Sequence, residues 1–156
     1  MLRPILLLTA VSGALDILFA MILTMTIGKG DIPKMLRGVA SGPFPQATEW
    51  GSSGAMLGLL VHFTLMAIMA TVFVLAARRY PDVVASPLKW GIVYGLITYV
   101  VMNWIVVPVR FDLPLPPKTV SIFTQLFAHI VLVGIPFGLI TARTLRPAAV
   151  AGVAPA

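Results

Sequence analysis

The sequence predicts an all-α integral membrane protein, a bundle of four transmembrane helices with a short interfacial helix in the first connection. Hydrophobic residues make up 59% of the chain and charged residues only 10%, whereas about a quarter of a soluble protein is charged. Four apolar runs are each long enough for a hydrocarbon core about 30 Å thick, which needs about 20 residues per helix. With 156 residues, we expect one transmembrane domain and no separate soluble catalytic domain.

The first predicted span covers residues 5–27 and follows Arg3. It is longer than the core of a signal peptide and contains Asp16, so we interpret it as a retained helix. Asp16 shares one helical face with small and polar residues, among them Ser12 and Gly13. We therefore expect this face to pack inward.

A polar connection rich in glycine and proline follows, from residue 28 to residue 53. Asp31 is a suitable N-cap, and Pro33 suits the first turn of a helix. Apolar residues over the next turns can form one face, which predicts a short interfacial helix. Trp50 suits the membrane interface just before the second span.

The second predicted span, 54–77, contains His62 as its only ionisable residue and is followed by two arginines. An ionisable side chain inside such a helix is costly unless it faces protein, water or a ligand. Gly54 and Gly58 stand one helical turn apart, and His62 lies one turn further on the same face. We therefore place His62 on a helix-packing face.

The third predicted span is 88–109, in which Gly91 and Gly95 have the spacing that lets helices approach closely. Asn103 lies near that glycine face, further along the same helix. The fourth predicted span is 121–142 and contains His129. The remaining residues, 147–156, are of low complexity and are expected to be disordered.

Four spans place both termini on one side of the membrane. Six Lys and Arg residues fall on that side and five on the other, and the long first connection should count for less. We therefore expect both termini in the cytoplasm and the protein in the cytoplasmic (inner) membrane. The net charge of +6 would suggest nucleic acid in a soluble protein. Here the cations flank apolar runs and act as lipid headgroup anchors, so the bilayer is the expected partner and nucleic acid is not.

The polar residues of the spans share one layer. His62 and His129 each lie eight residues inside their spans, about 12 Å below the same surface at 1.5 Å per residue. Asn103 lies about 10 Å and Asp16 about 17 Å below that surface. The sequence thus predicts a polar layer in the outer half of the bilayer.

Four interpretations of this layer remain open. The side chains could only hydrogen-bond one helix to another. The two histidines could ligate a b-type haem, or His62, His129 and Asp16 could hold a divalent metal. The same residues could also bind a proton or a small solute. The chain lacks cysteine, which excludes thiolate chemistry, and it has neither a Gly-x-Ser-x-Gly motif nor a helical carboxylate pair. An enzyme is therefore not expected.

Several phrases resemble those of a family of small bacterial inner-membrane proteins related to the YagU type. They are LRGVASG at 36–42, LGLLVHF at 57–63, YGLITYVVMN at 94–103, VVPV at 106–109 and AHIVLVGIPFGLITAR at 128–143. The resemblance implies a four-helix membrane protein, with His62, Asn103 and His129 at recurrent motif positions. It implies no particular reaction, and Asp16 lies outside the matching stretch.

The leading hypothesis is a non-enzymatic protein in which the polar layer binds a proton, a metal or a small ligand and serves transport or sensing. The alternative is a structural accessory subunit that packs through its glycine-lined and aromatic faces against other membrane subunits or against itself.

Overall fold

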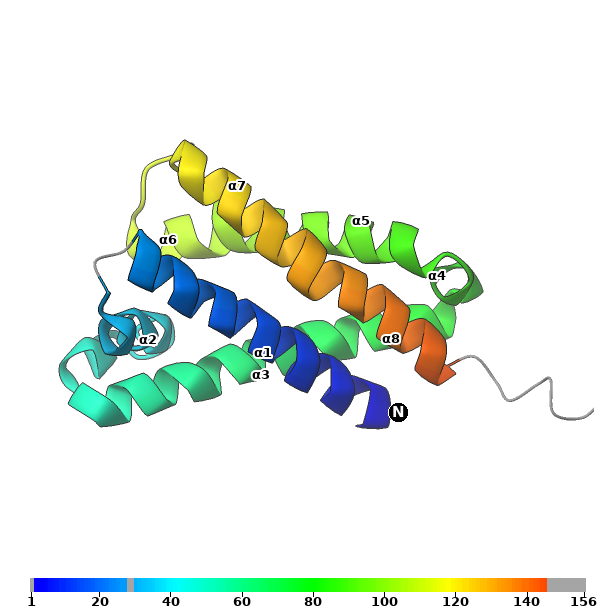
Figure 1. Cartoon of the computed structure of the whole chain (residues 1–156), viewed down its shortest axis with the longest axis horizontal. Coiled ribbons are helices and arrows are strands. Elements are labelled where there is room, and N and C mark those ends of the chain that lie inside the picture. The colour runs from blue at the N-terminus through cyan, green and yellow to red at the C-terminus, as the bar shows by residue number, and fades with distance from the viewer. Residues whose placement is uncertain (1, 28–29, 146–156) are drawn as a thin grey trace, which may run out of the picture.

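The computed structural model of the chain describes residues 2–27 and 30–145, and Figure 1 shows them as a bundle of helices. Four helical segments are long and apolar enough to cross a membrane, which confirms the predicted fold class. They are Leu2–Thr26, Gly51–Arg79, Pro87–Phe111 and Thr119–Leu145. Leu2 and Leu145 lie at the same end of the bundle. The predicted disordered tail, 147–156, lies outside the described residues.

The first two spans are continuous helices, α1 (Leu2–Thr26) and α3 (Gly51–Arg79). Their 25 and 29 residues correspond to about 38 and 44 Å at 1.5 Å per residue. Both exceed the hydrocarbon core of about 30 Å, so their ends reach the headgroup region. Large apolar side chains on their outer faces are exposed, as a lipid-facing surface requires.

The other two spans each contain a π-helical segment, which the sequence did not predict. The third span consists of α5 (Pro87–Val100), η2 (Val101–Val106) and α6 (Val107–Phe111), and the fourth of α7 (Thr119–Phe127), η3 (Ala128–Gly134) and α8 (Ile135–Leu145). Each π segment ends two residues before a proline, Pro108 or Pro136. Proline has no N–H and crowds the carbonyl four residues earlier, so the preceding turn widens.

The predicted short helix of the first connection is present as α2 (Ile32–Ala40). The Asp31 side chain caps it by accepting a hydrogen bond of 2.8 Å from the Lys34 N–H. A short 3-10 helix, η1 (Pro45–Glu49), follows. In Figure 1, α2 lies crosswise to α1 and α3 and closes the end of the bundle opposite to Leu2. The connection therefore forms a folded cover rather than a free loop.

The predicted glycine faces have different partners. A Cβ atom at Gly58 would overlap the Leu36 backbone, and one at Gly54 would overlap the Ala47 carbonyl. These two glycines therefore pack against α2 and η1, not against another spanning helix. Gly91 and Gly95 do face a spanning helix, since their Cβ atoms would overlap the backbone of η3.

An aromatic core fills the half of the bundle that carries Leu2. Phe73 of α3, Tyr94 of α5 and Phe137 of α8 form a ring cluster with centroids 5.0 to 5.9 Å apart. The Tyr94 hydroxyl also donates a 2.8 Å hydrogen bond to the Met69 carbonyl. Between the second and third spans, Pro81 begins the short helix α4 (Pro81–Ala85). The core thus lies on the side of α4, and the polar residues lie toward α2.

Candidate functional site

His62 is buried in the contact between α3 and α1, with a relative exposure of 8%. Its Nε2 lies 2.9 Å from the Gly13 carbonyl oxygen of α1. A carbonyl oxygen can only accept, so Nε2 carries the proton of this bond and Nδ1 is the atom left for other chemistry. A Cβ atom at Gly13 would overlap the Phe63 ring. Glycine at this position therefore allows α3 to approach closely enough for the bond to form.

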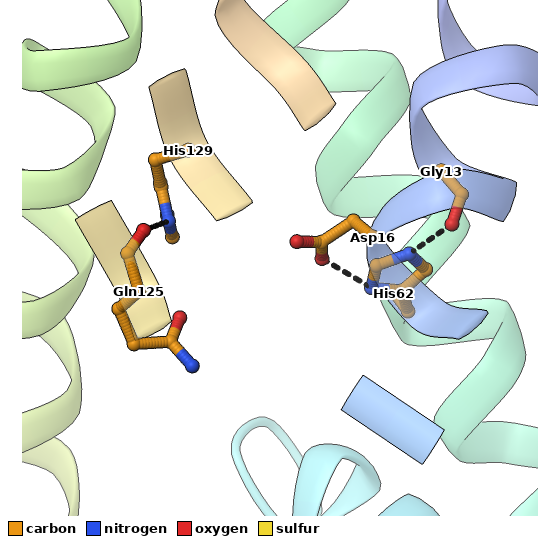
Figure 2. Close-up of polar contacts among 5 residues, drawn as sticks. All are labelled: Gly13, Asp16, His62, Gln125 and His129. Atoms are coloured by element: carbon orange, nitrogen blue, oxygen red, sulfur yellow. Dashed lines mark hydrogen bonds and ion pairs between the residues drawn. The ribbon is translucent and has the colours of Figure 1, made fainter. Parts of the chain in front are cut away.

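Asp16 lies one turn further along α1 than Gly13 and faces the same imidazole. Its Oδ2 is 3.9 Å from His62 Nδ1, and the relative exposure of the Asp16 side chain is 21%. Figure 2 shows the Asp16 carboxyl group between His62 on one side and His129 on the other. Asp16 is therefore the centre of the candidate site.

His129 belongs to η3 and is also buried, with 9% exposure. Its Nδ1 lies 3.0 Å from the Gln125 carbonyl oxygen, so Nδ1 is the donor and Nε2 remains an acceptor in the neutral ring. The edge of its ring meets the Tyr99 ring of α5 at a centroid distance of 6.0 Å. The Gln125 carbonyl of α7 and the Tyr99 ring of α5 thus orient the second imidazole.

Asn103 forms its hydrogen bond within its own helix. Its Nδ2 donates to the Tyr99 carbonyl of its own helix at 3.3 Å. Trp104 donates to the Tyr99 hydroxyl at 3.1 Å. Among the described residues, Asn103 has no hydrogen bond to Asp16, His62 or His129, and it is linked to the cluster through Tyr99, whose ring contacts His129.

The geometry fits neither of the cofactors considered from the sequence. Both ring nitrogens of His62 face protein atoms, so an axial bond to haem iron would break the contact with Gly13 or Asp16. For a divalent metal, the described residues contain no group of three His, Asp or Glu side chains that could ligate one ion. The donor set is better suited to a proton, which needs only one donor and one acceptor.

Gly13, Gln125 and Tyr99 complete the site, although the sequence did not predict their roles. Gly13 and Gln125 contribute backbone carbonyls, and a carbonyl leaves no trace in residue type. Gly13 could have been found, because it lies three residues before Asp16 on the small-residue face of α1. Tyr99 had a weaker signal, one turn before Asn103.

The four spans define a multi-pass membrane protein, and the site defines one with a buried carboxyl and imidazole cluster. No protein-family model matches the chain, and no curated protein or solved structure matches it. The assignment of a function therefore depends on the geometry of the cluster itself.

Proposed function

We propose that this chain is a non-enzymatic, YagU-like protein of a bacterial inner membrane, in which Asp16, His62 and His129 bind a proton and so serve transport or sensing. One observation carries the proposal. The carboxyl group of Asp16 lies between two imidazoles from two other spans (Figure 2). Intramembrane ionisable residues that face one another are typical of proton relays.

The hydrogen bonds of His62 leave one site for a proton between two groups. Since Nε2 is fixed as a donor to Gly13, a proton can reside on His62 Nδ1 or on Asp16. Either arrangement keeps the pair neutral overall, which lowers the cost of burial. The 3.9 Å between Asp16 Oδ2 and His62 Nδ1 is longer than a hydrogen bond. A small rotation of the half-buried carboxyl group would therefore be needed to bring it into hydrogen-bond distance of His62.

His129 lies on the other side of the carboxyl group from His62 (Figure 2). Its free Nε2 can accept a proton, whereas His62 alone would form a closed pair. Asp16 belongs to α1, which packs against both α3 and the fourth span. A change in the charge of Asp16 would therefore act on two helix contacts at once, which supports coupling between protonation and conformation.

The orientation proposed here has both termini in the cytoplasm. Among the described residues, five Lys and Arg residues belong to helix ends on the side of Leu2 and Leu145, and four belong to the α2 side of the bundle. The first group is Arg3, Arg78, Arg79, Lys89 and Arg143. The bias is small, but its direction follows the positive-inside rule. With this orientation the proton cluster lies nearer the outer surface.

The decisive experiment is nitrogen NMR of the labelled imidazoles in bilayers, because the chain contains only two histidines. In Asp16→Asn, we expect the proton occupancy of the His129 ring at a given pH to change, since this ring loses the charge of a neighbouring carboxylate. Asp82→Asn is the matched control, because Asp82 pairs with Lys89 outside the cluster. The proposal fails if Asp16→Asn leaves the titration of His129 unchanged.

The accessory-subunit alternative keeps less support. The glycine faces on which it depended are occupied within the chain, by α2 and η1 for Gly54 and Gly58 and by η3 for Gly91 and Gly95. Purification from native membranes in mild detergent separates the two functions. Migration of the protein alone would count against the subunit, and stable copurification with other membrane proteins would favour it.

A further inference from the structure

A half-open apolar groove lies on the side of the bundle, remote from the proton cluster. It has a volume of about 400 Å³ and is formed between α3, α4 and α5. Its lining residues are Phe73, Ala76, Tyr80, Asp82, Val83, Trp90, Val93, Tyr94 and Ile97. This volume is in the range of sites that hold one small ligand or chain. Because the groove belongs to two membrane-spanning helices, an apolar occupant can enter it from the bilayer.

Two cationic side chains lie over aromatic rings at one end of this groove. The Arg79 guanidinium lies 5.4 Å from the centroid of the Tyr80 ring, and Lys89 Nζ lies 5.1 Å from the Trp90 ring. Both rings line the groove. Cation–π contacts at this distance hold the charged groups near the ring faces. The positive charge is thus placed where an apolar channel meets the headgroup region.

Asp82 orients this end but does not neutralise it. Its Oδ2 accepts a 2.6 Å hydrogen bond from Trp90 Nε1 and lies 3.7 Å from Lys89 Nζ. Arg79 and its neighbour Arg78 remain as further exposed cations. The end of the groove therefore has an excess of positive charge, which is complementary to a phosphate diester.

We propose that this groove binds one anionic phospholipid, with an acyl chain along the apolar walls and the phosphate near Arg79 and Lys89. Each cation close to a membrane surface strengthens the binding of an anionic lipid several-fold. A zwitterionic lipid would enter the same groove without that gain. The inference is independent of the proton cluster and holds whichever function the cluster has.

Brominated lipids provide the test, because bromine quenches a nearby tryptophan. The variant Trp50→Phe with Trp104→Phe leaves Trp90 as the single tryptophan of the full chain. It is reconstituted in vesicles that contain acyl-brominated phosphatidylglycerol or acyl-brominated phosphatidylcholine at matched mole fractions. We expect phosphatidylglycerol to quench Trp90 with an apparent affinity roughly tenfold higher.

Two further variants make the site specific. Arg79→Gln with Lys89→Gln should remove the preference for phosphatidylglycerol, and both side chains are exposed, so folding should survive. Arg3→Gln with Arg143→Gln removes two cations from the same end, away from the groove, and should keep the preference. Ala76→Phe should reduce quenching by both lipids, because it fills the groove.

Three results would overturn the inference. The first is equal quenching by the two lipids. The second is an equal loss of preference in both charge variants, which would indicate surface charge alone. The third is absent quenching in a protein that is dimeric in the same vesicles, which would assign the groove to a second copy of the chain.

Discussion

Two helix contacts of this bundle differ in kind. The glycine seam joins α5 to η3 and α8 through Gly91, Gly95, Gly134 and Gly138. The polar seam joins α1 to α3 through Gly13, Asp16 and His62. In the glycine seam a Cβ atom at any of the four positions would overlap the facing backbone. The polar seam instead depends on one hydrogen bond and one longer carboxyl contact.

The glycine seam holds its helices rigidly together, whereas the polar seam carries the titratable groups. Helices in lipid gain little from the hydrophobic effect, so they associate through close packing and interhelical hydrogen bonds. The glycine seam uses the first and carries no titratable group of its own. It also holds the site, because a Cβ atom at Gly95 would overlap the His129 carbonyl. The backbone contact thus fixes His129, while the polar seam leaves the Asp16 carboxyl group room to respond.

The largest expected effect comes from breaking the glycine seam with Gly95→Ala. The added methyl group meets the backbone of His129 and Ile130, which cannot rotate away as a side chain could. We expect a loss of roughly 3 kcal/mol or more in the free energy of unfolding, at the upper end of overpacking costs. Reversible unfolding in mixed micelles, followed by circular dichroism, measures it.

Gly38→Ala is the control for this prediction. A Cβ atom at Gly38 of α2 would meet nothing within 4 Å. Alanine is also the better helix former, so this variant should be as stable as the parent or slightly more stable. If Gly95→Ala were equally harmless, the two spans would not be in backbone contact, and the distinction between the seams would be lost.

The two seams also differ in how far the sequence could predict them. Gly91 and Gly95 have a spacing with a direct physical meaning, and the structure confirms them as a packing face. Apolar length likewise predicted all four spans, each to within a few residues of its observed ends. The cap at Asp31 and the proline after it predicted α2. Each of these features depends on residues close together in the chain.

Contacts between residues far apart in the chain were harder to predict from the sequence. Gly54 and Gly58 have the same spacing as Gly91 and Gly95, yet they face α2 and η1, because spacing does not name the partner. Depth counting put Asp16 deeper than His62, but a carboxyl group on a half-buried side chain can lean toward its neighbour. Asn103 matched the depth of the histidines but bonds within its own helix. Which side chains meet depends on helix rotation, and one sequence does not fix that.

An intermediate effect is expected from the polar seam. His62→Phe removes the bond to Gly13 and leaves Asp16 without its nearest partner. We expect a loss of about 1 to 2 kcal/mol in the free energy of unfolding, as for other interhelical polar contacts in membranes. A double-mutant cycle with Asp16→Asn should give a coupling energy of about 0.6 to 1.7 kcal/mol.

A second cycle, Asp16→Asn with Thr71→Val, provides the control. The Thr71 hydroxyl bonds to the Ala67 carbonyl of its own helix at 2.7 Å, so it has no part in the seam. Its coupling to Asp16 should be close to zero. Equal coupling in the two cycles would mean that the 3.9 Å contact between Asp16 and His62 contributes nothing specific.

The smallest expected effect concerns the hydrogen bond between α5 of the glycine seam and α3 of the polar seam. Tyr94→Phe removes only the hydroxyl that bonds to the Met69 carbonyl of α3, while the ring keeps its contacts with Phe73 and Phe137. We expect a loss of about 0.6 kcal/mol, the average for such bonds in membranes. Tyr80→Phe, at a tyrosine that is 58% exposed, should change stability less. If Tyr94→Phe cost more stability than His62→Phe, the contact between α5 and α3 would contribute more to the stability of the bundle than the polar seam does. A change in the protonation of Asp16 could then alter the contact between α1 and α3 without unfolding the bundle.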